Sequence, residues 1–465
     1  MRKTKISLLS LHSNSVFPPL GIGHIAAWLD EHVPGVDVRI FDANFEDVEK
    51  RTIEWGADVV GATATTFTWK KACAALSNVK TALNVPTVIG GFHVSLMPEA
   101  MPKNIDFGVI GEGEVTFAEL IRAIRNGLPT DQIAGTCHWE GDKLIVLGNR
   151  DAIDIETIPM LDYRHMAKQY LYPKYHAGKL RSMATIASSR GCPFSCRYCC
   201  VSAFWKRQIR AQTPGYVARH AAMLMRKYGI DHIEFLDDFF IANPTRLHEM
   251  IRAFGDEGIL GKVTMAVLTK ASSITRATCL ALKELGVTYV GFGWESSSPS
   301  VLRYLKGDNA SVEGNSNAIT LLKAHGILSG GNMMMGSPTE KIKDMEMSAD
   351  FMRGAFDAGA HASVTVTTPL PGTALWDLAI SRGKINPSMD IELLDFNNPS
   401  NAMLLDDDVD REQFVEIFNS VYKLDRIEFW KTAWELMVLH AYGTFLAVAR
   451  HPFFYLSKVL KLCAR

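Results

Sequence analysis

The chain has 465 residues, and its 49 lysines and arginines almost balance 50 aspartates and glutamates, for a net charge of −1. Hydrophobic residues make up 47% and charged residues 21%, which excludes a disordered, collagen-like or disulfide-scaffold protein. The near-neutral charge argues against general electrostatic binding to nucleic acid, so we expect no nucleic-acid partner. The length predicts two or three domains. The first 15 residues lack the pattern of a signal peptide, and we expect a cytoplasmic protein.

The first 125 residues alternate strand patterns with helix patterns. Compact Val/Ile-rich runs that end in turn residues predict strands at 5–11, 36–43, 57–66, 85–91 and 106–112. Between them, apolar residues recur every three or four positions and predict helices at 21–32, 45–56, 69–83 and 114–124. Strands that alternate with helices form parallel βαβ units, so residues 1–125 are predicted to be a doubly wound α/β domain.

A polar, turn-rich segment at residues 126–180 is predicted to be a linker with a small hairpin. A second β/α series follows over residues 181–385, with strands expected at 183–191, 231–238, 263–269, 287–295, 330–336 and 362–368. Helical patterns such as 215–229 and 276–286 separate these strands. Six such units are too few for a closed eight-stranded barrel but suit an open, partial (β/α)6 barrel.

The last segment, residues 386–465, is predicted to be a helical tail that is acidic at first and apolar and aromatic towards its end. Its longest uncharged stretch, residues 436–449, is too short to span a bilayer. Two interpretations remain open. The tail is either a helix packed on the barrel, or an amphipathic segment with Lys458, Lys461 and Arg465 that touches a membrane surface or covers an apolar substrate.

Three cysteines stand close together in a loop that contains Gly and Pro, directly after the first strand of the second series: Cys192, Cys196 and Cys199. Three thiolates are one short of the usual four of a closed 4Fe-4S or structural zinc site, so one metal position is left open for chemistry. Eight cysteines are too few for a disulfide framework, which fits a reducing compartment. We interpret Cys200 as structural, because adjacent residues cannot easily both face one cluster.

The pattern Cys192-x3-Cys196-x2-Cys199, with Tyr198 before the last cysteine, resembles the signature loop of radical S-adenosylmethionine (SAM) enzymes. The resemblance extends to about residue 385 through the segments 236–239, 293–296, 336–340 and 369–373. It implies that the three cysteines hold a 4Fe-4S cluster whose fourth iron binds SAM. One electron from the cluster would then cleave SAM to a 5′-deoxyadenosyl radical, and a flavodoxin or ferredoxin would be the electron donor.

The same resemblance implies SAM contacts at the strand ends, where the active site of a β/α barrel gathers. Glu295 is expected to accept hydrogen bonds from the SAM ribose, and Asp237 and Asp238 to do likewise or to line the substrate pocket. Tyr198 and Gly336 are the other expected SAM contacts. For each carboxylate, a role as the cap of the next helix remains open.

A doubly wound domain ahead of such a barrel resembles the cobalamin-binding subclass of this family. The segments 18–23, 41–43, 89–93 and 110–114 carry the resemblance, and they stand at strand ends, where ligands of open α/β sheets bind. Glycine there lets backbone approach a corrin closely. The expected cobalamin contacts are Gly21, Asp42, Gly90, Gly91, His93, Gly111, Glu112 and Gly113.

The Asp-x-His-x-x-Gly motif, whose histidine ligates cobalt in several cobalamin enzymes, is absent from this sequence. We therefore expect no protein histidine on the cobalt, with His12, His24 and His93 as the alternative candidates. A domain of this shape that has lost cobalamin is the other open interpretation.

The sequence predicts a cobalamin-dependent radical SAM enzyme with a 4Fe-4S cluster, SAM and cobalamin as cofactors. Methylation of a carbon of a small-molecule, lipid or tetrapyrrole-like substrate is favoured over radical oxidation or ring closure, as in the anaerobic magnesium-protoporphyrin cyclase that this architecture resembles. A tRNA methylthiotransferase is disfavoured, because residues 1–125 contain only Cys73 and the tail is not a basic sheet.

Overall fold

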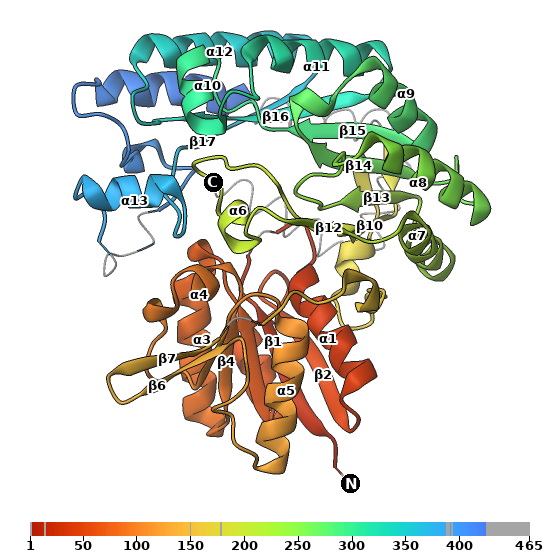
Figure 1. The fold of residues 1–465 in the computed structure, drawn as a ribbon, viewed down its shortest axis with the longest axis vertical. Coiled ribbons are helices and arrows are strands. Elements are labelled where there is room, and N and C mark those ends of the chain that lie inside the picture. Colours follow the sequence, from red (N-terminus) through yellow and green to blue (C-terminus); the bar gives the residue numbers. More distant parts are fainter. Residues whose placement is uncertain are drawn as a thin grey trace. The chain divides into compact units, whose positions relative to one another are not determined.

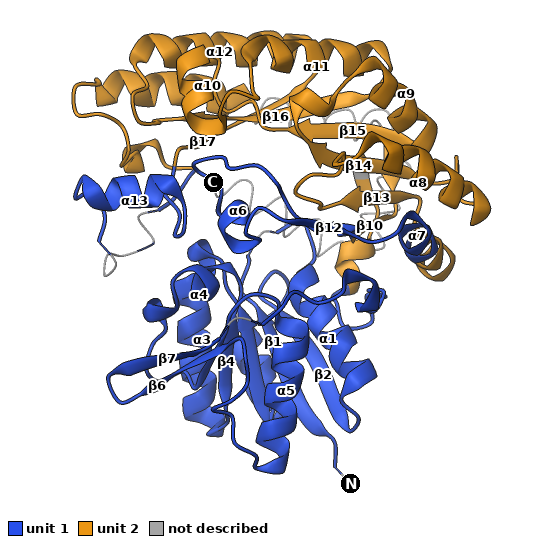
Figure 2. Cartoon of the chain, in the orientation of Figure 1, with its two compact units in different colours: residues 1–167, 186–220, 368–396 blue, residues 168–185, 221–367, 397–465 orange. Residues whose placement is uncertain are grey.

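The structure is a computed structural model. It describes residues 2–424 except 14, 149, 177–178, 387–390 and 392–393, so the apolar part of the predicted tail, with Lys458, Lys461 and Arg465, lies outside the described residues. The chain divides into two compact units (Figure 2). The first contains the residues up to Ala167, Ile186–His220 and Thr368–Phe396, and the second contains Lys168–Thr185, Ala221–Thr367 and the residues from Asn397 onward. Within the described ranges, no helix combines the length and apolar character that a membrane crossing needs.

The described part of the first unit is built on a seven-stranded sheet of order β2-β1-β3-β4-β5-β6-β7 (Figure 1). Its parallel strands match the five predicted ones and are β1 Thr4–Ser10, β2 Val36–Asp42, β3 Val59–Thr63, β4 Thr87–Gly90 and β5 Phe107–Val109. The predicted small hairpin forms as β6 Thr136–Glu140 and β7 Lys143–Leu147. It pairs antiparallel with β5 and therefore extends this sheet.

Helices cover both faces of the first sheet, as a doubly wound fold requires. They are α1 Leu20–His32, α2 Val48–Trp55, α3 Trp69–Leu83, α4 Phe92–Leu96 and α5 Gly113–Asn126. Side chains along β1 alternate between two apolar cores, with Ile6 and Leu8 in the core that α1 and α5 complete, and Leu9 in the core that α3 completes. The predicted α/β fold of the N-terminal domain is therefore confirmed.

The described residues of the second unit carry the six-stranded sheet of the predicted partial barrel, in the order β10-β13-β14-β15-β16-β17. Its strands are β10 Met183–Ile186, β13 His232–Phe235, β14 Thr264–Thr269, β15 Val287–Phe292, β16 Leu328–Met335 and β17 His361–Val366. The pairs from β13 to β17 are parallel. The helices between these strands are α8 Pro244–Asp256, α9 Arg276–Leu285, α10 Pro299–Lys306, α11 Val312–Ala324 and α12 Ile342–Asp357, and α7 Pro214–Tyr228 runs from the first unit into the second.

Candidate active site

The cysteine loop belongs to the first unit, where it connects β11 Ser189–Gly191 to α6 Cys200–Phe204. Strand β11 pairs antiparallel with β12 Ile209–Ala211, so a short hairpin closes the base of the loop. Gly191 enters the loop with φ +93°, and a Cβ at this position would stand 2.1 Å from the carbonyl oxygen of Gln208. Only glycine fits here, both for its conformation and for the close backbone approach.

Cys192, Cys196 and Cys199 are partly exposed. The backbone N–H of Cys199 donates to the carbonyl of Cys196 at 3.2 Å, so these two cysteines share one tight turn. In the described ranges, no three His, Cys, Asp or Glu side chains gather as they would around a single metal ion. Each thiolate of a 4Fe-4S cluster binds a different iron, so its ligands need not converge on one point. The donor set, three thiols in one partly exposed loop, fits a 4Fe-4S cluster with one open iron.

The residues around the thiols fix the ends of the loop. Cys200 is the first residue of α6 and is half-buried, as is Tyr198. The Ser202 hydroxyl donates to the Cys199 carbonyl at 3.0 Å. The backbone N–H of Leu375, in α13 Ala374–Ser381, donates to the Arg197 carbonyl at 3.2 Å, which links the loop to a segment far away in the chain.

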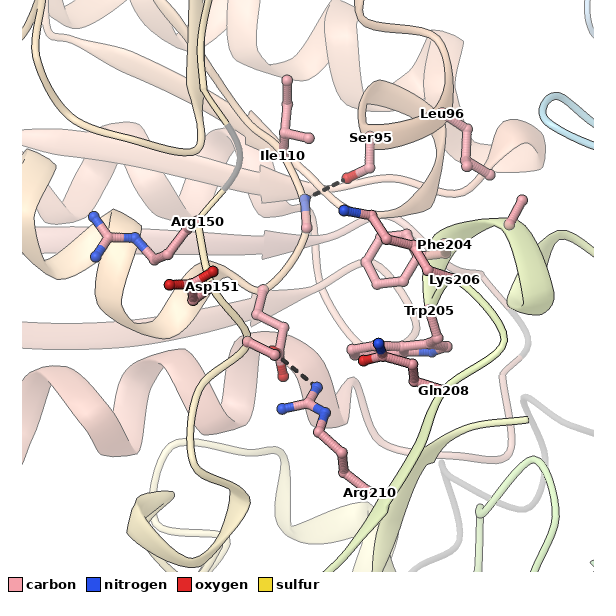
Figure 3. Close-up of a pocket in the computed structure, with 14 residues that line it drawn as sticks. Ser95, Leu96, Ile110, Arg150, Asp151, Phe204, Trp205, Lys206, Gln208 and Arg210 are labelled. Carbon is pink, nitrogen blue, oxygen red and sulfur yellow. Dashed lines mark hydrogen bonds and ion pairs between the residues drawn. The ribbon is translucent and has the colours of Figure 1, made fainter. Parts of the chain in front are cut away.

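A cavity of about 340 Å³ opens in the first unit beside Gly111, one of the predicted cobalamin contacts (Figure 3). Residues 203–210, which follow the cysteine loop, line it together with residues at the ends of α4 and β5. Gly111 has φ +76°, and a Cβ built on it meets no atom within 4 Å. The backbone N–H of Gly111 donates to the Ser95 hydroxyl at 3.0 Å. This hydrogen bond holds the backbone of Gly111, which has no side chain, at the cavity wall. This geometry allows a ligand to lie against Gly111.

The other glycines predicted at the corrin differ in what surrounds them. A Cβ on Gly91 would lie 2.6 Å from the Ala64 carbonyl oxygen, and one on Gly113 would lie 2.9 Å from the Ile25 side chain. Packing inside the domain therefore already requires Gly91, which also has φ +102°, whereas at Gly113 the flexible end of the Ile25 side chain could shift. Gly21 is exposed with open space beside it, and Gly90 makes only ordinary contacts. Among this set, Gly21 and Gly111 leave room for a ligand.

Two of the remaining predicted cobalamin contacts, His93 and Asp42, are buried. His93 is 1% exposed, its Nδ1 lies 3.1 Å from the Thr66 hydroxyl and its ring packs 4.3 Å from that of Trp69. Burial lowers the pKa of His93 to about 4. Asp42 is 3% exposed and accepts a hydrogen bond from the N–H of Asn44 at 2.9 Å. Burial also lowers the pKa of His12, and burial together with nearby Arg190 and His220 lowers that of His24 to about 3.

Glu112 is already engaged in ion pairs. Its Oε1 accepts from Arg190 at 2.5 Å, and its Oε2 accepts from Arg210 at 2.9 Å and from the N–H of Ile153 at 3.1 Å. Burial alone lowers the pKa of Arg190, but the carboxylates of Glu114 and Glu112 more than offset it, so this pKa lies above its ordinary value. Arg190 and Glu114 were not among the predicted site residues.

In the second unit, Glu295 follows β15 and adopts a left-handed conformation with φ +60°. This conformation costs a residue other than glycine of order 1–3 kcal/mol and is typical of functional sites. The side chain is 5% exposed, and Lys306 at the end of α10 donates to its Oε1 at 3.2 Å and to the Gly293 carbonyl at 2.7 Å. Sequence reasoning missed Lys306, because no local pattern connects a helix end with a strand end.

Gly336 shapes a second strand end of this unit. The backbone N–H groups of Gly336 and Ser337 donate to Glu340 Oε2 at 2.8 and 2.9 Å, and Gly336 has φ +84°. Glu340 is completely buried, and burial raises its pKa from 4.5 to about 8 despite these two hydrogen bonds. The nearest atoms to a Cβ on Gly336 belong to Ala402 and Phe414, so its side-chain position faces the protein interior.

Glu340 predicts a pH dependence of stability. As the pH rises from 4.5 to about 8, the unfolded chain releases a proton that native Glu340 retains, so the contribution of this residue to the free energy of unfolding falls. We expect Glu340→Gln to gain stability relative to the wild type over this range. Urea unfolding at several pH values measures the difference, with Glu346→Gln as the exposed control on α12. If the difference in free energy of unfolding between Glu340→Gln and the wild type did not change with pH, native Glu340 would not retain its proton over this range.

A cavity of about 540 Å³ lies on the inner face of the second sheet. Its walls carry the polar side chains of Asp238, Tyr289, Asn332, His361 and Ser363, and its floor includes glycines of β15 and β16. Ser363 donates to the Asn332 amide oxygen at 3.0 Å, so this pair has a set orientation. The cavity can hold a ligand with several hydrogen-bonding groups.

The two predicted aspartates at the end of β13 occupy different environments. Asp238 lines the cavity on the inner face of the sheet, whereas Asp237 is 0% exposed and lies outside the cavity lining. Both residues lie beyond β13, which ends at Phe235, and Asp238 stands in the turn that follows.

Comparison with known proteins identifies two family domains. The model described as "Radical SAM superfamily" matches residues 186–352, and the model described as "B12 binding domain" matches residues 6–121. The "uncharacterized methyltransferase PH0819" of Pyrococcus horikoshii is 31% identical over 371 residues, which cover 78% of this chain and 79% of that protein. The anaerobic magnesium-protoporphyrin IX monomethyl ester cyclase of Synechocystis sp. is 30% identical over 337 residues, or 67% of this chain and 63% of that protein.

Among solved structures, the radical SAM methyltransferase TsrM from Kitasatospora setae, with cobalamin and a 4Fe-4S cluster bound, superposes with a TM-score of 0.66. It is 18% identical, and the match covers 83% of this chain and 76% of that one, which shows a shared fold. These matches confirm the predicted fold class, the predicted enzyme class and the predicted cofactors, a 4Fe-4S cluster, SAM and cobalamin. The chain belongs to the radical SAM superfamily, in the group of its members that carry a B12-binding domain.

Proposed function

We propose that this protein is a cobalamin-dependent radical SAM methyltransferase that methylates a carbon of a small-molecule substrate. The observation that carries the proposal is the 31% identity with a methyltransferase along 78% of the chain, which includes both family domains. The polar lining of the cavity in the second unit supports a substrate with hydrogen-bonding groups.

The proposed roles of the residues follow from their positions. Cys192, Cys196 and Cys199 hold the 4Fe-4S cluster, and Tyr198, Asp237, Asp238, Glu295 and Gly336 bind or frame SAM and the substrate. Gly21 and Gly111, which leave room for a ligand, contact cobalamin, and the buried residues Asp42 and His93 together with Gly90, Gly91 and Gly113 shape the strand ends that support it. With these cofactors in place, the chemistry supplied is one-electron cleavage of SAM and transfer of a methyl group.

The domain boundaries and the partners predicted from the sequence are proposals. We propose domains at 1–125, 181–385 and 386–465, a linker at 126–180, and a flavodoxin or ferredoxin as electron donor. A lipid-like substrate, a cytoplasmic location and peripheral membrane contact through the tail are likewise proposals.

The test of methyl transfer uses SAM with a deuterated methyl group. A methyltransferase of this type consumes two SAM per turnover, so S-adenosylhomocysteine and 5′-deoxyadenosine should form together once an anaerobic extract supplies the substrate. Mass spectrometry should then find the deuterated methyl group in one product. If neither S-adenosylhomocysteine above background nor a labelled product forms, methyl transfer is wrong.

Radical oxidation or ring closure is the second candidate, and the 30% identity with the anaerobic cyclase favours it. A cyclase should yield 5′-deoxyadenosine without S-adenosylhomocysteine. The same labelled reaction therefore separates the two candidates, and magnesium-protoporphyrin monomethyl ester can be supplied directly in place of the extract.

We also expect cobalt to carry no protein histidine. His93 is buried and oriented by Thr66, and His24 is 7% exposed, so neither imidazole is presented at the domain surface. Electron paramagnetic resonance of the Co(II) protein should lack nitrogen superhyperfine splitting from a lower ligand. Splitting that disappears on replacing His12, His24 or His93 would contradict this expectation.

A further inference from the structure

A largely buried network of four charged side chains joins the base of the cysteine loop to the end of the first sheet. It consists of Glu112 and Glu114, which stand where α5 begins, and of Arg190 and Arg210, which stand on β11 and β12. All four belong to the first unit. Their side chains are 11%, 4%, 14% and 22% exposed, in that order.

Arg190 is the centre of this network. One of its terminal nitrogens donates to Glu112 and the other to Glu114, so a single guanidinium bridges both carboxylates. A planar guanidinium can do this because its donors point in fixed, diverging directions, whereas a lysine ammonium is a single point charge. Arg190 is separated from Cys192 only by Gly191. The position of the bridge therefore determines where the loop begins.

Arg210 completes the network from the other strand of the hairpin. Arg190 and Arg210 are directly paired in the β11–β12 register, so two like charges lie side by side. Glu112 accepts from both, and Arg210 also donates to the Ile153 carbonyl at 2.6 Å. Both oxygens of Glu112 are therefore engaged within the protein, although the residue also lines the cavity beside Gly111.

We propose that Arg190 is a positioning residue whose bridge to Glu112 and Glu114 sets the cysteine loop, and hence the cluster, at a fixed distance from the cobalamin site. This inference rests on the proposed function. The physical reason is that a buried ion-pair network contributes little net stability compared with apolar packing, but it strongly penalises every arrangement that separates its partners. The strand end that carries Glu112 also carries Gly111, so one short segment touches both sites.

The test compares Arg190→Lys and Glu114→Gln with a matched control. Arg190→Lys keeps the charge but replaces two diverging guanidinium nitrogens with one ammonium nitrogen on a shorter side chain, and Glu114→Gln keeps the shape but removes one charge. The control is Lys80→Met, which breaks the partly buried pair of Lys80 with Asp106 in the same unit, away from the loop. Thermal unfolding establishes that each variant is folded.

Hydrogen exchange of the apo-protein gives a readout that needs no cofactor. In both network variants, the amides of residues 191–211 should exchange at least about tenfold faster than in the wild type. The reason is that local opening of this segment no longer has to separate Arg190 from both Glu112 and Glu114. The Lys80→Met control should leave this segment unchanged. Unchanged exchange in folded Arg190→Lys would overturn the proposal, whether or not the protein is a methyltransferase.

Electron paramagnetic resonance then measures the geometry itself. Reduced cluster and Co(II) cobalamin are both paramagnetic, and each speeds the relaxation of the other to an extent that falls steeply with distance. In Arg190→Lys the relaxation of the Co(II) signal should become slower or more broadly distributed, with both cofactors still bound. Relaxation identical to that of the wild type would overturn the proposal. A wild-type protein that takes up no cobalamin would instead contradict the proposed function, and the exchange result would still decide the role of Arg190.

Discussion

Replacing Cys192, Cys196 and Cys199 together with alanine is expected to abolish both the brown chromophore of the reconstituted protein and the reductive cleavage of SAM. The three thiols are the donor set that the loop offers, and alanine cannot bind iron. Absorbance and iron content measure the cluster, and chromatography of 5′-deoxyadenosine measures SAM cleavage. The effect should be a complete loss.

The neighbouring thiol provides the control for this experiment. Cys200 is also partly exposed but begins α6, so Cys200→Ala should keep the cluster and SAM cleavage. A triple variant that retained a full complement of iron, or a Cys200→Ala variant that lost it, would show that the ligand set differs from the one proposed.

Lys306→Met is expected to destabilise the protein by about 3–5 kcal/mol, because it removes the cation from a buried carboxylate. The side chains of Lys306 and Glu295 are each 6% exposed. The backbone of Glu295 itself has the left-handed conformation, with φ +60°. Denaturant unfolding of the apo-protein measures this change. The same variant should also bind SAM more weakly, because Glu295 loses the contact that orients its carboxylate.

Two further variants distinguish the loss of stability caused by breaking a buried ion pair from that caused by removing any lysine. The double variant Glu295→Gln with Lys306→Met removes both charges and should recover much of the lost stability. Lys341→Met breaks a 2.7 Å pair with Asp408 in which both residues are largely exposed, and it should change stability little. If Lys306→Met were no more destabilising than Lys341→Met, Glu295 would not depend on Lys306.

The sequence alone determined the order of elements and the chemical class of the enzyme. Alternating Val/Ile-rich runs and three-to-four periodicity are local signals, and the strands expected at 5–11 and 36–43 appear as β1 and β2 within a residue or two. The cysteine spacing is equally local, because the three cysteines lie in one short loop and their pattern is recognised without any residue from elsewhere in the chain. Local signals of this kind are complete within a few neighbouring residues, so they can be recognised in the sequence by itself.

Only the tertiary structure decided what individual residues contact. Glycines at 91, 111 and 113 look alike in the sequence, yet a Cβ on Gly91 would meet backbone, one on Gly113 would meet only the end of the Ile25 side chain, and Gly111 faces a cavity. Glu112 pairs with Arg190 at a separation of 78 residues. Contacts of this range arise from the way strands and helices fold together, and no periodic pattern within either segment encodes them. That is why the fold and the cofactor class could be predicted from the sequence, whereas the role of Arg190 required the structure.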